Sequence, residues 1–394
     1  MTKKILFLYH TSTIGGGSFC LLNILKNIDR GSITPSVLLI EEGPLVKEIK
    51  NLGINVFFLS KMHDVPYNTT IFTISKIRNA FDIYCSLKQF EDLIKEIKPD
   101  VVYINTMMLY PYLRAAKRSR CRTVMHIREH WPEGEHSWQR NTALEHIAKY
   151  ADEVIAINRY SASMIKSYNR TATIVYDWID MTSRFANMPI SSIFGENMNN
   201  NKMLLYMGGM QKIKGALEVV TAFSYYIKDE DYRLLILGID PNFKSKGLRG
   251  AIKKILSFFG KKTYSDKVIS LINSDKRIKC IPSLYNIRHL YEQAYGVISY
   301  FTIPHANLAM AESIICNTLS IAARTDESME YSLEGDLAVL YVENDFDDFV
   351  KKILGIESYR EDYLLKINAR AKEVEIMFDP KQNIEKLNKI LETI

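Results

Sequence analysis

Short apolar runs alternate with amphipathic segments along the whole chain. Seven runs of strand length lie in the first half and six in the second: KILFLY, SVLLI, NVFFL, DVVYIN, RTVMHI, DEVIAIN and TATIVY, then KMLLYMGG, YRLLILG, RIKCIP, YGVISYF, LSIAA and LAVLYV. Segments between them, such as FEDLIKEIK, have helical spacing. Because the runs are continuous rather than alternating, both strand faces should be buried, which predicts parallel sheets covered by helices on both sides.

The pattern stops in a polar, asparagine-rich segment between Asp177 and Asn201 and then restarts. We therefore predict an α/β protein with two doubly wound, Rossmann-like domains facing each other across a cleft, residues 1–182 and 183–375. The last helix, 376–394, either packs simply at the C-terminus or crosses back to the first domain. Ligands of such sheets bind beyond the carboxyl ends of the strands, so the cleft is the expected site.

Composition narrows the class of protein. The 394 residues, 47% hydrophobic and 24% charged, suit a globular chain of about two domains. No apolar run reaches the ~18 residues that span a bilayer, and the N-terminus lacks a signal-peptide pattern, so we expect a cytoplasmic protein. The five scattered cysteines fit buried thiols in a reducing compartment. A net charge of +6 and the absence of any nucleic-acid module exclude nucleic acid as the expected partner.

Three consecutive glycines, Gly15, Gly16 and Gly17, stand between the first predicted strand and a helix. Glycines at a helix start let backbone N–H groups approach an anion or a sugar hydroxyl. A dinucleotide fingerprint is the alternative, but its first glycine follows the strand almost directly, and Cys20 stands where its third glycine belongs. Glu41 and Glu42 after the next strand could imitate the ribose-binding acid, so the residues alone leave this alternative open.

Eight segments in order resemble the retaining glycosyltransferases of family 4, which have the GT-B fold. They are KILFLYHTSTIGGGSFCLLNIL, EEGPLVKEIKNLGINVFFL, DVVYINT, RTVMHIREHW, ADEVIAIN, YMGGMQKIKGALEVVTAF, LLILGID and AMAESIICNTLSIAA, and the resemblance as a whole extends from Lys4 to about Leu391. The resemblance implies transfer of a sugar from a nucleoside diphosphate sugar to an acceptor. It also assigns the Gly15–Gly17 loop to the donor phosphates and the acceptor, and Glu41-Glu42 to a loop common in the family.

In the second domain, the resemblance implies a diphosphate site around Gly208, Gly209, Lys212 and Lys214. Lys214 matches the family lysine that stabilises the charge developing on the leaving diphosphate, which a fixed cation in a dry site does effectively. The alternative is that Lys214 is a surface lysine at a helix start without a role in binding. Gly209 replaces the family's arginine, and Lys212 is a candidate substitute for that cation.

The family's E-x7-E segment reads from Pro304 to Glu312, and Pro304 replaces its first glutamate, which contacts the donor sugar. Glu312 matches the second glutamate, which binds the ribose hydroxyls. We expect Asn307 to cap a helix whose first N–H groups receive phosphate. The candidate phosphate-binding positions are the four residues at this helix start: His305, Ala306, Asn307 and Leu308.

In the first domain, His126 matches the family histidine near the donor sugar and phosphate; a buried structural histidine is the alternative. Arg128 is a candidate to supply the cation that Gly209 removes. Glu129 is the nearest carboxylate for a sugar or acceptor hydroxyl. The resemblance implies no metal ion and no cofactor beyond the donor substrate, and the acids of Asp345–Asp348 are expected at a helix start, where they favour the macrodipole.

Two basic stretches leave two interpretations open. Arg114–Arg122 is either a solvated helix end followed by an edge strand or a site for an anionic membrane or acidic acceptor. Phe243–Tyr264, a basic amphipathic insertion, either packs on its own domain or lies on a membrane surface.

We therefore predict a cytoplasmic, metal-independent, retaining hexosyltransferase, with peripheral membrane contact as an open alternative. Its expected acceptor is a glycan or a polyprenyl-diphosphate-linked sugar in bacterial surface polysaccharide assembly, such as O-antigen, capsule or exopolysaccharide. Two alternatives remain: a non-catalytic glycosyltransferase-like protein that binds a nucleotide or a partner, favoured by Gly209 and Pro304, and a GT-B nucleotide-sugar epimerase.

Overall fold

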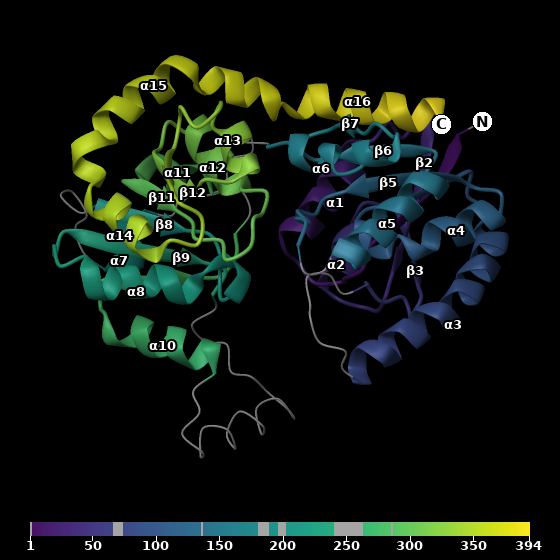
Figure 1. Cartoon of the computed structure of the whole chain (residues 1–394), viewed down its shortest axis with the longest axis horizontal. Coiled ribbons are helices and arrows are strands. Elements are labelled where there is room, and N and C mark those ends of the chain that lie inside the picture. The colour runs from purple at the N-terminus through teal and green to yellow at the C-terminus, as the bar shows by residue number, and fades with distance from the viewer. Residues whose placement is uncertain are drawn as a thin grey trace. The chain divides into compact units, whose positions relative to one another are not determined.

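The chain divides into two compact units in the computed structural model, Met1–Trp178 with Phe378–Ile394, and Ile179–Met377 (Figure 1). The structure describes residues 2–65, 74–134, 137–179, 189–195, 202–239, 263–284 and 287–394. Most of the asparagine-rich segment and almost all of the basic insertion lie outside the described residues. No helix in the described ranges is long and apolar enough to cross a membrane.

The first unit is built on a seven-stranded, all-parallel sheet with the order β3-β2-β1-β4-β5-β6-β7. Its elements are β1 (Lys3–Leu8), α1 (Gly16–Asn27), β2 (Ile33–Leu39), α2 (Pro44–Asn51), β3 (Asn55–Phe58), α3 (Ile74–Ile97), β4 (Val101–Ile104), η1 (Met107–Leu109), α4 (Pro111–Arg118), β5 (Arg122–Ile127), α5 (Ser137–Tyr150), β6 (Glu153–Ala156), α6 (Arg159–Ser163), η2 (Lys166–Tyr168), β7 (Thr173–Ile174) and α16 (Pro380–Thr393).

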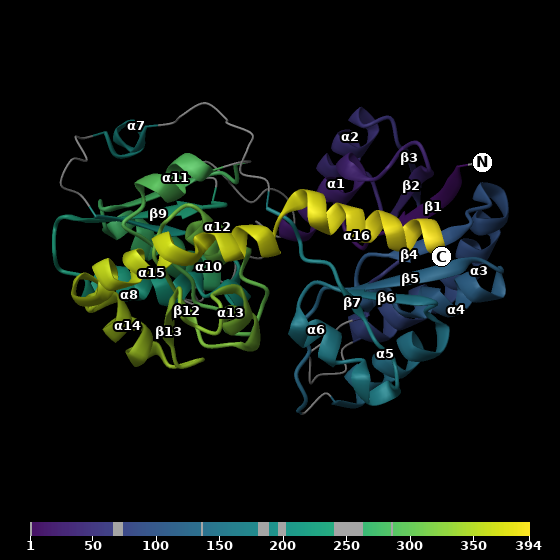
Figure 2. The same cartoon turned by 90° about the horizontal axis from the view of Figure 1, so that it is seen from above.

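Alternate residues of these strands enter two apolar layers. Leu6 and Leu8 of β1 pack with α3, α4 and α5, whereas Ile5 and Phe7 pack with α1 and α2. Figure 2 shows α1 and α2 on one side of this sheet and α4 and α5 on the other. Both faces of the strands are therefore buried, as their continuous apolar runs predicted.

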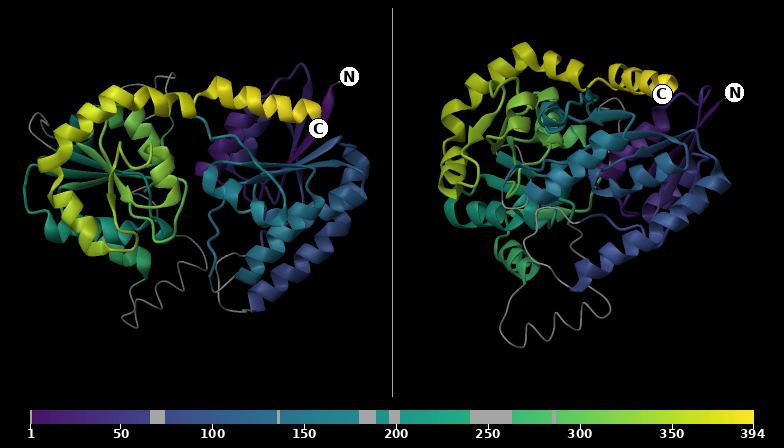
Figure 3. Two further views of the ribbon diagram at one scale, coloured as in Figure 1. Left: turned by 45° about the horizontal axis from the view of Figure 1, so that its top comes forward. Right: turned by 45° about the vertical axis from the view of Figure 1, so that its right-hand side comes forward.

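The C-terminal helix α16 belongs to the first unit. Its residues Leu387 and Leu391 are fully buried in the layer formed with α1 and α2. The Lys3 ammonium donates a hydrogen bond to the carbonyl of Glu392 at 2.8 Å, close to the two chain ends (Figure 3). The last segment of the chain thus completes the core that its first strand begins.

The second unit repeats the plan with six parallel strands in the order β10-β9-β8-β11-β12-β13. Its elements are α7 (Ile190–Phe194), β8 (Lys202–Tyr206), η3 (Lys212–Lys214), α8 (Ala216–Tyr226), β9 (Tyr232–Leu237), α10 (Tyr264–Ser274), β10 (Ile278–Ile281), α11 (Arg288–Gln293), β11 (Gly296–Ile298), α12 (Leu308–Ile315), β12 (Ser320–Ala323), α13 (Asp326–Tyr331), β13 (Val339–Tyr341), α14 (Phe346–Leu354) and α15 (Ile356–Met377). Every apolar run predicted as a strand contains one, which confirms the predicted class of two doubly wound parallel sheets.

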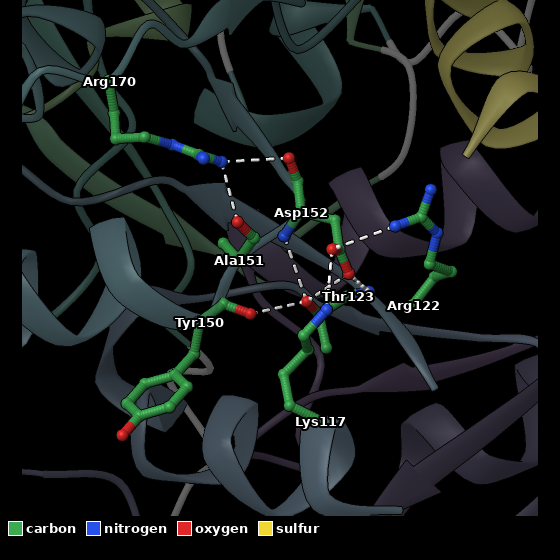
Figure 4. Close-up of polar contacts among 7 residues, drawn as sticks. All are labelled: Lys117, Arg122, Thr123, Tyr150, Ala151, Asp152 and Arg170. Atoms are coloured by element: carbon green, nitrogen blue, oxygen red, sulfur yellow. Dashed lines mark hydrogen bonds and ion pairs between the residues drawn. The ribbon is translucent and has the colours of Figure 1, made fainter. Parts of the chain in front are cut away.

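The basic stretch Arg114–Arg122 is held by acidic partners at the amino ends of the strands. Lys117 and Arg122 contact the Asp152 carboxylate at 2.7 and 3.3 Å, and Thr123 donates its backbone N–H to the same group at 2.8 Å (Figure 4). Burial alone would raise the pKa of Asp152, but the hydrogen bonds from Lys117 and Thr123 outweigh it and lower that pKa. The edge strand in the first of the two interpretations is wrong, because β5 lies between β4 and β6.

Candidate functional site

In each sheet, the strand order reverses direction between two neighbouring strands. These are β1 and β4 in the first unit and β8 and β11 in the second. The crossovers from these neighbouring strands leave toward opposite faces of the sheet, so a crevice opens at their carboxyl ends, where ligands of doubly wound sheets bind. The segments that follow β1, β8 and β11 contain twelve of the fifteen predicted site residues, and the other three, His126, Arg128 and Glu129, lie at the carboxyl end of β5, next to β4.

In the first unit, the glycine loop starts α1 directly above the switch point. Gly15 occupies the N-cap position, and a Cβ on Gly15 or Gly16 would meet no atom of the described residues within 4 Å. A Cβ on Gly17 would lie 2.5 Å from the Tyr9 hydroxyl. Packing against Tyr9 therefore demands a glycine only at position 17, and the other two leave the helix start open to a ligand.

The loop containing Glu41 and Glu42 is hydrogen-bonded to Ser12, in the segment that leads to the glycine loop. Ser12 donates its hydroxyl to the carbonyl of Glu41 and accepts the backbone N–H of Leu45 at 3.0 Å. Glu42 is exposed and pairs with Lys50 at 3.4 Å. This arrangement gives the acidic pair a place in loop packing, as the resemblance implies, rather than a ribose-binding role.

His126 lies at the carboxyl end of β5 and is 1% exposed. Its Nδ1 is 2.6 Å from the hydroxyl of Tyr103 on β4, whereas its Nε2 has no partner within the described residues. Burial, together with the nearby charge of Arg128, lowers the pKa of His126 well below its usual value. The imidazole is therefore neutral at pH 7, with one nitrogen available to a ligand.

Arg128 is anchored by an acid that the sequence reading missed. One guanidinium nitrogen lies 2.5 Å from each carboxylate oxygen of Asp177, beyond β7, and both side chains are about one-tenth exposed. Burial alone would lower the pKa of Arg128, but the charge of Asp177 outweighs it and raises that pKa. Asp177 thus offsets the positive charge of Arg128, which the sequence analysis had proposed as a cation for the leaving phosphate.

Glu129, which follows β5, accepts a hydrogen bond from the first backbone N–H group of the short helix η1. Its carboxylate accepts hydrogen bonds from the Thr106 hydroxyl and from the backbone N–H groups of Met107 and Arg128, the latter two at 3.0 Å. These three bonds occupy both carboxylate oxygens. The structure therefore gives Glu129 a role in holding the β4 and β5 loops together.

In the second unit, tight glycines shape the segment after β8. Gly208 approaches the Tyr206 hydroxyl so closely that a Cβ there would lie 1.9 Å from it, and that hydroxyl donates to the Lys214 carbonyl at 2.8 Å. Gly209 has φ +57°, a left-handed backbone that disfavours the arginine expected from the resemblance. Tyr206 thereby fixes the turn η3, which includes Lys212 and Lys214.

Lys214 is partly buried, and its ammonium pairs with no acid among the described residues. Burial lowers its pKa. Lys212 is exposed. The carbonyl of Ile213, between the two lysines, accepts the backbone N–H of Thr302 at 3.0 Å, so the lysine turn lies against the loop that follows β11.

That loop leads through His305 and Ala306, both partly buried, into α12, with Asn307 at the N-cap. The Asn307 side chain does not cap the helix as expected; its amide donates to the Ser299 hydroxyl at 2.8 Å instead. Within the described residues, the backbone N–H groups of Leu308 and Ala309 have no acceptor. The helix start therefore keeps unsatisfied donors of the kind that bind an anion.

Glu312 lies one turn into α12 and is partly buried. One carboxylate oxygen accepts a hydrogen bond from the hydroxyl of Tyr291 on α11, and the other makes no bond to a described residue. Burial raises the pKa of Glu312 to about 7, although the Tyr291 hydrogen bond acts in the opposite direction. One oxygen remains available to a hydroxyl group.

The acids of Asp345–Asp348 have a local structural role. Asp345 caps α14 by accepting the backbone N–H of Asp348 at 2.9 Å, and Asp348 accepts the backbone N–H of Val342 at 2.8 Å. In the described parts of the chain, no three His, Cys, Asp or Glu side chains gather as metal ligands would.

Two all-parallel, doubly wound α/β units in one chain define the GT-B fold, and comparison with solved structures agrees. The chain resembles HepE from Anabaena in complex with UDP-glucose, with a TM-score of 0.73 and 18% identity over 99% of this chain and 100% of that one. It resembles a sucrose-phosphate synthase from Thermosynechococcus elongatus, with a TM-score of 0.66 and 13% identity over 99% and 98%.

A putative UDP-N-acetylglucosamine 2-epimerase from Listeria monocytogenes shares the fold at a lower TM-score of 0.56, with 12% identity over 92% of this chain and 90% of that one. No protein-family model matches this sequence, and no curated protein matches it by sequence. At these identities, the likeness establishes the fold.

Proposed function

We propose that this protein is a glycosyltransferase that moves a sugar from a UDP-sugar to an acceptor hydroxyl. Fold alone does not decide function, so the proposal depends on the site of the second unit. It extends to the finer expectations from the resemblance: a retaining, metal-independent enzyme of family 4.

The main support for this proposal is a set of three complementary features at the β8–β11 switch point. Lys214 offers a cation without an acidic partner among the described residues, and the start of α12 offers the free N–H groups of Leu308 and Ala309. Glu312 offers a carboxylate oxygen about one helical turn further on. A diphosphate needs cations and N–H donors, and a ribose diol needs a carboxylate acceptor, so the set suits a nucleoside diphosphate.

UDP-glucose is the first donor to test, because HepE, the structural neighbour with a TM-score of 0.73, was solved with it. In the first unit, the glycine loop and His126 would serve the sugar and the acceptor. We propose a glycan or polyprenyl-diphosphate-linked acceptor in bacterial surface polysaccharide assembly, and therefore work at the cytoplasmic membrane surface.

The first test is thermal unfolding with UDP, UDP-glucose and other nucleoside diphosphates, on the wild type and on Lys214→Ala and Glu312→Ala. Ligand that binds only the folded state raises the melting temperature by mass action. We expect UDP compounds to stabilise the wild type and to lose that effect in both variants. Lys228→Ala and Glu361→Ala, which change exposed residues of the same unit, should behave as the wild type.

The absence of any shift with millimolar nucleotide would contradict the proposal and favour a partner-binding protein. Turnover distinguishes the remaining candidates. The 2-epimerase likeness makes epimerisation the second candidate, and an epimerase converts its sugar nucleotide without an acceptor. A transferase releases UDP in an acceptor-dependent way, and the anomeric configuration of its product tests retention.

A further inference from the structure

Two buried nitrogen atoms at the carboxyl ends of β4 and β5 have no hydrogen-bond partner among the described residues. They are Nδ2 of Asn105, which is 0% exposed, and Nε2 of His126, which is 1% exposed. Buried polar groups are nearly always paired, because an unpaired one forfeits its bonds to water. Two such atoms on neighbouring strands indicate a place that a ligand completes.

The pairing of β4 with β5 places the two residues side by side. Ile104 is aligned with Met125, so Asn105 and His126 follow at the same level of adjacent strands. Residues at one level of a parallel pair point to the same face, and neighbouring strands lie about 4.8 Å apart. This face also carries Tyr9 and Tyr103, and α1, which begins at the glycine loop, covers it.

Arg128 decides which atoms of the two side chains are donors. A guanidinium only donates, and its Nη1 lies 3.4 Å from Nδ1 of His126 and 3.5 Å from Oδ1 of Asn105. The Tyr103 hydroxyl also contacts Nδ1, at 2.6 Å. Nδ1 therefore accepts, the ring proton resides on Nε2, and the Asn105 amide turns its NH2 group toward the unfilled position.

Asp177 holds the guanidinium of Arg128 in place, because both of its carboxylate oxygens lie 2.5 Å from Nη2. A planar, doubly anchored guanidinium keeps a defined orientation and a compensated charge. Arg128 thus acts on a ligand through the side chains that it orients.

We infer that Tyr103 and Arg128 are positioning residues that present Nε2–H of His126 and the Nδ2 amide of Asn105 as a donor pair to one oxygen group of the ligand. That oxygen accepts two hydrogen bonds, as a sugar hydroxyl or a phosphoryl oxygen does. The identity of the ligand rests on the proposed function, whereas the orientation of the two side chains does not.

The orientation is tested on the free protein by 15N-histidine NMR, with His126→Gln used to assign the His126 signals. We expect the neutral Nε2–H tautomer for at least about nine-tenths of the molecules between pH 6 and 8, because the guanidinium of Arg128, which only donates, faces Nδ1 and the Tyr103 hydroxyl can donate to the same atom. Tyr103→Phe should raise the fraction of the Nδ1–H form. Tyr112→Phe, which removes a buried tyrosine bond of the same length to Ser86, should not.

The donor role is tested by calorimetry with UDP-glucose and UDP on Asn105→Asp, which keeps the acceptor that faces Arg128 but removes the two N–H donors. We expect about tenfold weaker binding, the scale of one lost hydrogen bond. Loss for UDP-glucose alone assigns the pair to a sugar hydroxyl; equal loss for UDP assigns it to the diphosphate. Asn141→Asp, at an exposed asparagine that also accepts from an arginine, is the control.

A wild-type Nδ1–H tautomer or a charged His126 at pH 7 would overturn the inference. So would Asn105→Asp binding both nucleotides within twofold of the wild type. If the wild type binds neither nucleotide, the proposed function fails, and the NMR result by itself upholds or overturns the positioning role.

Discussion

Glu312 should make the stability of the second unit depend on pH, and Glu312→Gln should remove that dependence. Burial raises the pKa of this carboxyl from 4.5 to about 7. The folded protein therefore binds a proton between these two values that the unfolded chain releases. The contribution of the protonated group is complete below pH 4.5 and is lost as the pH rises through 7.

The magnitude follows from the same two values. One pH unit of difference between folded and unfolded pKa corresponds to about 1.4 kcal/mol, so an ionised Glu312 costs the free fold about 3 kcal/mol. Glutamine has the shape of the protonated acid and cannot ionise. The variant should exceed the free energy of unfolding of the wild type by about 1 kcal/mol at pH 5 and by about 3 kcal/mol at pH 8.

The assay is urea unfolding at pH 5, 6, 7 and 8, followed by a probe in the second unit. Glu292→Gln, at an exposed glutamate on the adjacent helix α11, is the matched control and should leave the pH profile of the wild type unchanged. Tyr291→Phe removes the hydrogen bond that favours the ionised form, so it should move the midpoint of the pH profile upward. Parallel profiles of the wild type and Glu312→Gln would refute this reasoning.

Three further outcomes can be measured by urea unfolding and nucleotide binding. Gly215→Ala should cost at least about 3 kcal/mol, since its Cβ would lie 2.1 Å from the Tyr300 carbonyl, whereas Gly53→Ala, with a similar positive φ but open space, should cost about 1 kcal/mol; equal costs would contradict the packing argument. Lys214→Met should stabilise the free protein, because it removes a buried cation without a described acidic partner, yet weaken UDP binding by about 10- to 100-fold, and unchanged affinity would count against the diphosphate site. Asp177→Asn should cost about 3–5 kcal/mol by leaving Arg128 buried without its acid, and Asp177→Leu combined with Arg128→Met should recover most of that loss; a loss below 1 kcal/mol would show that the pair is solvated.

The positions of the strands along the chain could be predicted from the sequence because they depend on short-range patterns. Continuous apolar runs such as DVVYIN and RTVMHI predict strands buried on both faces, and the structure forms β4 and β5 there. The same patterns could not predict side-chain partners. Glu129 has the sequence position of a site carboxylate, yet its hydrogen bonds to Thr106 and Met107 give it a structural role.

Residues to which the sequence analysis assigned no role supply much of the candidate site. Tyr103 and Asn105 belong to an apolar run that reads as an ordinary strand, and Tyr291 belongs to an unremarkable helix. For Tyr103 and Asn105, the position at the carboxyl end of a strand was the available signal. Asp177, which is 49 residues from Arg128 in sequence, had no signal at all, because an ion pair between distant segments leaves no periodic trace.

The sequence by itself determined the order of the strands and helices along the chain, the doubly wound class and the glycine-rich start of α1, since these follow from patterns of nearby residues. The tertiary structure decided which groups are paired and which are left for a ligand. Asp177 compensates Arg128, whereas Lys214 meets no described acid. Pairing is set by contacts that form only when separate strands meet at the switch point of a folded sheet, so the chemistry of the site is a property of the packed molecule.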